Sequence, residues 1–199
     1  MYISVCVSIA TVESESKHRA EWITAICTLV MAVTGLWALV YAYRQLKQGH
    51  EEAQVERLLN QVRLYGEQPM VSYRIAYAEQ RLKGVSRPSA QYEILNFFET
   101  IGLLVDRGYL DATDVWENFS DDMLTFYADT RDELLEEQRT DPTFYNHFVS
   151  LIEKLRVIEK AQHGTREPVT KEDLKDYWTD ETTLVPGSPP VRKRPQKSK

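Results

Sequence analysis

An uncharged stretch near the N-terminus constrains the fold of this chain more than any other feature. The segment WITAICTLVMAVTGLWALVYAY, from Trp22 to Tyr43, contains no Asp, Glu, Lys or Arg. Its length is close to the roughly 20 residues with which a helix crosses the hydrocarbon core of a bilayer. Trp22 and Tyr43 stand at its two ends, as expected for aromatic side chains at membrane interfaces. The sequence therefore predicts a single transmembrane helix at residues 22–43.

The alternative interpretation of this segment is a buried helix of a soluble protein. Such a helix is usually apolar along one stripe, whereas residues 22–43 are apolar on all sides. The preceding residues 1–21 form a leader or flank. Because Met1–Val12 has no basic residue, it lacks the pattern of a cleavable signal peptide. We expect the transmembrane helix to be retained as an anchor.

The distribution of positive charge predicts the orientation of the anchor. Lys17 and Arg19 precede the segment, and a larger group follows it, consisting of Arg44, Lys47, Arg57 and Arg63. This excess favours a cytoplasmic location for the C-terminal part. The two cysteines, Cys6 and Cys27, lie outside that part, which agrees with a reducing compartment. Neither has the neighbours of a metal site or a redox pair.

The remainder of the chain has the pattern of an all-α domain. Gly and Pro number only 8 each, and no segment shows the sustained alternation of a β-strand. We expect the membrane helix to continue as a stalk at residues 44–66 and to lead into a domain at residues 67–180. About five helices would form this small bundle. Residues 181–199, which are rich in proline, would form a disordered tail.

Helix-capping residues mark the expected boundaries within the domain. In NFFETIGLLVDRGYLDATDVW, from Asn96 to Trp116, Gly108 can close one helix and Asp111 can cap the next. Asp141 followed by proline predicts another helix start. Thr170 predicts the start of the last helix, with Asp173 three residues later.

Glu99 is a carboxylate within the most apolar of these helices. A buried carboxylate needs a partner, so Glu99 is predicted to form a buried ion pair with an arginine or to bond a tyrosine hydroxyl. A catalytic role is the less favoured alternative, because nothing nearby supplies a second catalytic group.

The segment YEILNFFETIGLLVDRGYLDATDVWENFSDDMLTFY, followed by FYNHFVSLIEKL, resembles a bacterial family known only as a domain of unknown function. The resemblance covers most of Trp22–Leu155, and its most specific part is the Phe-Phe-Glu…Gly…Gly-Tyr-Leu stretch around Glu99. It implies an N-terminal anchor in the bacterial cytoplasmic membrane and a small helical domain in the cytoplasm. It implies no catalytic residues.

No motif of a catalytic, cofactor-binding or metal site is present in the sequence. None of the histidines, which are His18, His50, His147 and His163, has the spacing of a metal ligand pair. Phosphate-binding loops and nucleophile motifs are also missing. We therefore expect no enzyme activity, no cofactor and no small-molecule substrate. The enzyme alternative is a helical ribonuclease that uses Arg156 and His163, whose spacing occurs in such enzymes.

The basic tail has two interpretations: an end that only keeps the chain soluble, which is the commoner outcome, and a segment that contacts the membrane surface. Its positive side chains are Arg192, Lys193, Arg194, Lys197 and Lys199, and each would contribute about 1 kcal/mol near anionic lipid headgroups. A net charge of −6 for the whole chain argues against nucleic acid as the partner.

The leading functional hypothesis is a membrane-anchored scaffold or regulator that binds a protein partner or itself. A third alternative is an effector that perturbs the membrane when the anchor oligomerises through Thr34, Ala38 and Ala42, because small residues at this spacing let helices approach closely.

Overall fold

The computed structural model describes residues 3–165 and 167–187. In its first helix, the side chains of residues 3–21, 23–27, 46–48, 50 and 51 lie outside the description. The predictions for Cys6, Cys27 and the basic residues 192–199 therefore fall outside the described part of the chain.

The chain divides into two compact units, Met1–Glu52 and Ala53–Lys199. Helix α1 spans Ile3–Gly66 and so contributes to both units. Among the residues that the structure describes, no helix is long and apolar enough to cross a membrane. The predicted span from Trp22 to Tyr43 is therefore not confirmed.

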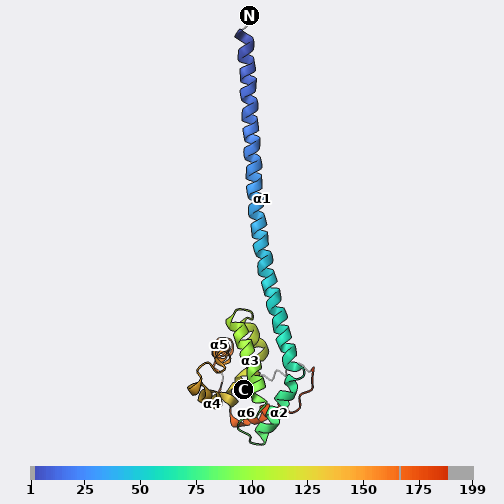
Figure 1. Cartoon of the computed structure of the whole chain (residues 1–199), viewed down its shortest axis with the longest axis vertical. Coiled ribbons are helices and arrows are strands. Elements are labelled where there is room, and N and C mark those ends of the chain that lie inside the picture. The colour runs from blue at the N-terminus through green and yellow to red at the C-terminus, as the bar shows by residue number, and fades with distance from the viewer. Residues whose placement is uncertain (1–2, 166, 188–199) are drawn as a thin grey trace. The chain divides into compact units, whose positions relative to one another are not determined.

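The second unit is built from the end of α1 and the helices that follow it, which Figure 1 shows in chain order. The described part of the chain contains no strand, so the predicted all-α class is confirmed. The helices after α1 are α2 (Met70–Leu82), α3 (Gln91–Asp106), α4 (Ala112–Thr140), α5 (Asn146–His163) and α6 (Lys171–Glu181).

Two predicted helix starts are confirmed by their hydrogen bonds. The Asp111 side chain caps α4 by accepting from the backbone N–H of Thr113 at 2.7 Å. At α6, Thr170 and Asp173 form a reciprocal capping box. Gly108 lies between α3 and α4 with a φ of 71°, a conformation that glycine adopts without steric cost.

The predicted start of a helix at Asp141 is wrong. The Asp141 side chain accepts from the backbone N–H of Thr143 and so stabilises a turn. Helix α5 begins later, at Asn146, and its capping position, Tyr145, has a φ of 49° and no side-chain cap. An Asp-Pro pair favours a tight turn as well as a helix start, and here the turn forms.

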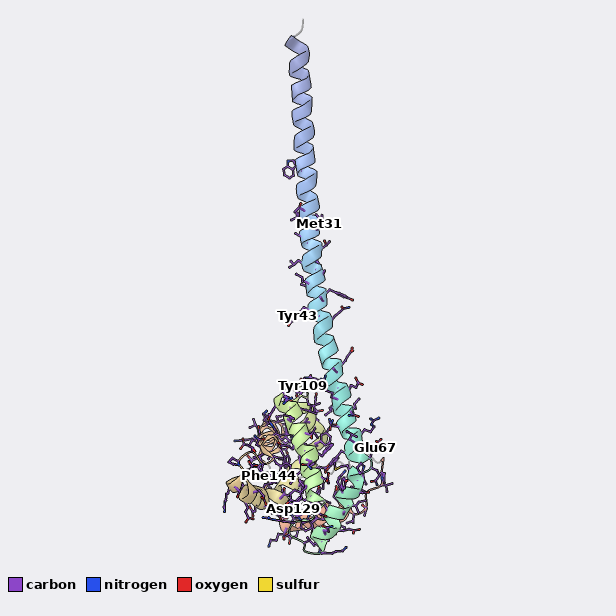
Figure 2. The ribbon with its side chains drawn as sticks, in the orientation of Figure 1. Met31, Tyr43, Glu67, Tyr109, Asp129 and Phe144 are labelled. Carbon is purple, nitrogen blue, oxygen red and sulfur yellow. The ribbon has the colours of Figure 1, made fainter. Side chains whose placement is uncertain are left out.

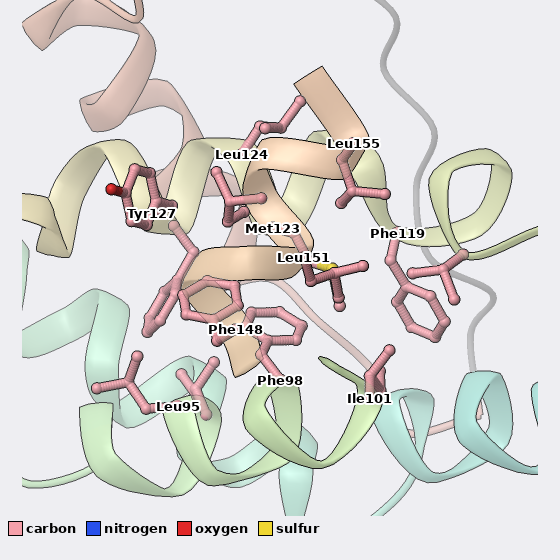
Figure 3. Packing of buried hydrophobic residues seen from close by; sticks show 14 of the residues in the cluster. Leu95, Phe98, Ile101, Phe119, Met123, Leu124, Tyr127, Phe148, Leu151 and Leu155 are labelled. Carbon is pink, nitrogen blue, oxygen red and sulfur yellow. The ribbon is translucent and has the colours of Figure 1, made fainter. Parts of the chain in front are cut away.

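Helix α3 supplies one side of the hydrophobic core. It packs against α2 and α5, α5 packs also against α4, and α6 contacts α2 and α4. Figure 3 shows Phe98 and Ile101 of α3 opposite side chains of α4 and α5. Phe98 is 0 % exposed. The nearest rings to it belong to Tyr65, Phe97, Phe126 and Phe148.

The end of α1 belongs to this core. Leu58 and Tyr65 are buried, and Val62 packs partly against the cluster. The C-terminal end of the predicted stalk thus packs onto the later helices, although Val55 is 53 % exposed.

Candidate functional site

A buried arginine lies on the core-facing side of α2. Arg74 is 3 % exposed and shares this side with Val71 and Ala78. Residues at these spacings lie on one face of a helix, so Arg74 occupies a position where an apolar residue is normally found. A buried guanidinium requires partners for its charge and its N–H groups.

The main partner of Arg74 is Glu181, the last residue of α6. Arg74 Nε donates to Glu181 Oε2 at 2.7 Å, and Nη2 donates to Oε1 at 2.6 Å. The two side chains are 4 % and 6 % exposed. Paired N–H bonds of this kind are charge-assisted and geometrically specific. The pair therefore fixes the end of α6 against α2.

Tyr65, near the end of α1, forms another wall of the site. The guanidinium carbon of Arg74 lies 3.9 Å from the centre of the Tyr65 ring, which is cation–π geometry. Arg74 Nη1 also donates to the Tyr65 carbonyl at 3.4 Å. The buried Tyr65 hydroxyl faces Asp122, whose carboxylate is its nearest polar partner in the site.

A second carboxylate, on Asp122 of α4, faces the same guanidinium. Its Oδ2 lies 4.0 Å from Arg74 Nη2, and its side chain is 18 % exposed. Burial raises the pKa of Asp122 to about 7; Arg74 opposes this rise and Glu181 adds to it. Burial also raises the pKa of the Tyr177 hydroxyl of α6. Asp122 therefore titrates close to neutral pH.

The raised pKa of Asp122 predicts a pH-dependent stability. In the unfolded chain an aspartate titrates near about 3.9, so between about pH 4 and pH 7 the folded domain holds a proton that the unfolded chain has released. The free energy of unfolding must then fall as pH rises through this range. Asp122→Asn removes the titration and should stabilise the domain by about 1–3 kcal/mol at about pH 8.

Urea unfolding of the full chain at about pH 5 and about pH 8 measures this effect. Asp132→Asn, an exposed change on the same helix, is the matched control and should leave the pH dependence as in the wild type. An Asp122→Asn variant with the same pH dependence as the wild type would contradict the assignment.

A neighbouring cluster connects α2, α4 and α6. Arg81 Nε lies 3.2 Å from Asp129 Oδ2, and Arg81 Nη1 lies 3.0 Å from Glu133 Oε1. Trp178 Nε1 of α6 donates to Asp129 Oδ2 at 3.0 Å, and the Tyr77 hydroxyl donates to the same oxygen. Figure 2 labels Asp129 in the second unit. Helix α6 is thus held at two points, by Glu181 on Arg74 and by Trp178 on Asp129.

This arrangement is an internal ion-pair cluster between helices. One buried guanidinium faces two carboxylates, and Glu181, the more tightly bound, belongs to a short helix at the end of the domain. Within the described part of the chain, no group of three or more His, Cys, Asp or Glu side chains is placed to hold a metal ion.

Glu99 contacts a helix end. Its Oε2 accepts from the backbone N–H of Phe148 at 2.7 Å, and its Oε1 accepts from the N–H of His147 at 3.3 Å. These groups belong to the first turn of α5, where backbone N–H groups lack partners within the helix. Glu99 therefore caps α5 from another helix, and the partners of its carboxylate are backbone amides rather than the expected arginine or tyrosine.

Gly102 makes this close approach feasible. It lies one turn after Glu99 on α3, and a Cβ built on it would lie 2.4 Å from the His147 carbonyl oxygen. The backbone of α5 occupies the volume that a side chain at position 102 would need. Glu99 and Gly102 together position the start of α5.

Removing the Glu99 carboxylate should destabilise the domain. Glu99→Ala leaves the two N–H groups without acceptors, and we expect a loss of about 1–3 kcal/mol in the free energy of unfolding. The measurement is urea unfolding of the full chain. Glu93→Ala, on the exposed side of the same helix, is the control and should cost much less; equal losses would show that Glu99 is no cap.

Arg156 and His163, the pair of the ribonuclease alternative, contact different rings of α4. The Arg156 guanidinium lies 5.2 Å from the centre of the Tyr127 ring. The His163 ring lies 5.3 Å from that of Trp116. Arg156 and His163 thus contact two different aromatic side chains, Tyr127 and Trp116.

Sequence reasoning missed Arg74, Asp122 and Glu181. In α2 the apolar Leu82 is 42 % exposed, whereas the charged Arg74 is 3 % exposed. A signal was available, because Val71, Arg74 and Ala78 follow helical spacing and place an arginine in an apolar stripe.

One comparison with known proteins gives a match. The family model described as "Domain of unknown function (DUF4760)" matches residues 24–155. No curated protein and no solved structure matches the chain. The match includes Arg74, Glu99 and Asp122 but ends before α6, so Glu181 lies outside the matched residues.

Proposed function

The chain belongs to the DUF4760 family, and we propose that it is a single-pass protein of the bacterial cytoplasmic membrane whose helical domain acts as a scaffold or regulator. The anchor would be the helix at residues 22–43. The domain would lie in the cytoplasm and act by binding a protein partner or a second copy of the chain, not by catalysis.

The observation that carries the proposal is the exposure of apolar side chains along α1. Every described side chain from residue 28 to residue 45 is exposed, and Leu36, Trp37 and Leu39 are 64 %, 69 % and 69 % exposed. Figure 2 marks Met31 and Tyr43 on this helix. Apolar surface of this extent is rarely left in water. Lipid would cover it on all sides.

The polar groups of this segment are compatible with lipid. The Thr34 hydroxyl donates to the carbonyls of Val30 and Met31 at 2.9 and 3.0 Å. A hydroxyl that bonds within its own helix imposes a small cost in hydrocarbon. The excess of Lys and Arg after the segment supports a cytoplasmic domain.

The polar side chains of the domain favour a structural role over a catalytic one. Arg74 and Arg81 are engaged in ion pairs between helices, and Glu99 caps α5. These contacts use the charged groups to hold helices together. A packed helical unit of this kind presents surfaces to partners, and the anchor would confine it to the membrane.

Membrane fractionation of the full chain expressed in bacteria tests the anchor. We expect the wild type to stay in the pellet after alkaline extraction, as integral proteins do. Met31→Arg combined with Leu36→Arg should release it, because each arginine near the centre of a span costs about 2.5–3.5 kcal/mol on insertion scales. Val157→Arg, at an exposed apolar residue of the domain, is the control. A wild type released by alkali would contradict the proposal.

A further inference from the structure

The cluster around Arg74 brings two carboxylates to one guanidinium. Glu181 accepts from Nε and Nη2 of Arg74 at 2.7 and 2.6 Å, whereas Asp122 Oδ2 lies 4.0 Å from Nη2. The charges of these three groups cancel when Asp122 holds a proton, and they sum to one negative charge when Asp122 is ionised. Because an uncompensated charge is unfavourable in a buried site, ionisation of Asp122 must disturb the contacts around Arg74.

The titratable and charged groups that face Asp122 come from α4 itself and from three other helices. They are Tyr65 of α1, Arg74 of α2, Asp121 of α4, and Tyr177 and Glu181 of α6. Burial opposes the ionisation of Asp122 most strongly, and the charges of Glu181 and Asp121 oppose it as well. The charge of Arg74 and the hydroxyl of Tyr65 favour it. The balance raises the pKa of Asp122 to about 7.

An ionised Asp122 competes with Glu181 for the same guanidinium nitrogen. Nη2 of Arg74 lies 2.6 Å from Glu181 Oε1 and 4.0 Å from Asp122 Oδ2. A charged Asp122 attracts this nitrogen and repels the Glu181 carboxylate, whereas a protonated Asp122 has no net charge with which to do either. Protonation of Asp122 therefore strengthens the paired bonds between Arg74 and Glu181, and ionisation weakens them.

The segment behind α6, residues 182–187, is attached at both ends by backbone hydrogen bonds. Near its start, the N–H of Leu184 donates to the carbonyl of Glu181 at 3.3 Å. At its end, the N–H of Gly187 donates to the carbonyl of Gly66, the last residue of α1, at 2.9 Å. The position of this segment therefore depends on where these two carbonyls lie.

Both attachment points adjoin the Arg74 cluster. Glu181 is a member of the cluster, and Gly66 directly follows another member, Tyr65. The carbonyl of Tyr65 accepts from Arg74 Nη1 at 3.4 Å, and the Tyr65 ring centre lies 3.9 Å from the guanidinium carbon. A movement of Arg74 toward Asp122 would therefore act on the start and the end of the segment together.

We infer that the Arg74 cluster is a proton-controlled switch, in which a proton on Asp122 keeps residues 182–187 attached to the end of α1 and its release to solvent loosens them. Helix α6 stays in place, because Tyr177 and Trp178 pack against the core. The inference goes beyond the proposed scaffold or regulator and does not depend on the anchor, since every group of the cluster belongs to the helical domain. It would make one surface of that domain responsive to pH.

Spin labelling of the full chain in detergent micelles tests the switch. Val185 is 63 % exposed, so a nitroxide at Val185→Cys reports the mobility of residues 182–187 with little disturbance of packing. Cys6 and Cys27 are replaced by Ala in every sample, so that the label reacts at one position. We expect the mobile component of the spectrum to grow as the pH rises, with a midpoint near pH 7.

Asp122→Asn removes the group that binds the proton and keeps the position uncharged. The Val185 label should then stay at its low-pH mobility from about pH 6 to about pH 8. This variant is expected to be more stable than the wild type at the upper pH, so loss of the fold does not obscure the result. Asp132→Asn is the matched control and should respond to pH as the wild type does.

A label at Val157→Cys separates a local change from a general one. Val157 is 70 % exposed and belongs to α5, which contributes no group to the cluster, so its spectrum should be the same at both pH values. Three results would each overturn the switch: a wild-type Val185 spectrum that ignores pH, an Asp122→Asn spectrum that still responds to it, or a Val157 label that becomes mobile together with Val185.

Discussion

Gly102→Ala should destabilise the domain severely. The new Cβ would lie 2.4 Å from the carbonyl oxygen and 2.5 Å from the carbonyl carbon of His147. These are backbone atoms and cannot rotate away, so α3 and α5 would have to separate. The Glu99 bonds to α5 would lengthen in the same movement. We expect the free energy of unfolding to fall by at least about 3 kcal/mol, the upper part of the range for overpacking.

Urea unfolding of the full chain in detergent micelles measures this loss. Gly49→Ala is the matched control, since that helical glycine has nothing within 4 Å of its added Cβ. It should leave the unfolding of the domain unchanged. A Gly102→Ala domain as stable as the control would show that the two helices can separate at little cost.

Phe98→Ala should destabilise the domain by a similar amount, because it removes volume from the core whereas Gly102→Ala adds volume. The ring is 0 % exposed and lies 5.4 Å from Phe148 and 5.5 Å from Phe126. Its removal leaves a cavity where α3, α4 and α5 meet. Large-to-small changes of this kind cost about 3–5 kcal/mol.

Phe144→Ala provides the comparison for Phe98. Phe144 is half-buried and packs at 4.4 Å on the ring of Tyr145. Its loss should lower the urea midpoint much less than the loss of Phe98. Equal shifts of the midpoint would mean that α3 does not form the centre of the core.

The sequence predicts the fold well where the signals are local. The Asp111 cap and the Thr170 capping box each involve residues that are close together in the sequence, and both predictions are confirmed. The start of α5 is different, because the carboxylate that caps it is Glu99, 49 residues before Phe148. Local residues indicate Asp141 instead. Local sequence patterns cannot predict a helix start that depends on a side chain far away in the sequence.

The candidate site was predicted less well than the fold. Sequence patterns do not identify Arg74 as a buried residue, because an arginine within a helix is ordinarily assigned to the surface. Its partner Glu181 lies 107 residues away, and the proline-rich composition that follows it placed residue 181 in a disordered tail. Neither Arg74 nor Glu181 has a recognisable sequence signal, and only the packing of α6 on α2 brings the two side chains together.

The capping of α5 by Glu99 has a consequence for how this family can vary. Because α3 fixes where α5 begins, the segment between α4 and α5 need not carry a start signal of its own. Insertions or deletions between Asp141 and Tyr145 should be tolerated as long as the backbone at positions 147 and 148 still reaches the carboxylate. The start of α5 then depends on Glu99 and Gly102, and the composition of the loop is constrained mainly at Phe144 and Tyr145, which pack partly against the core.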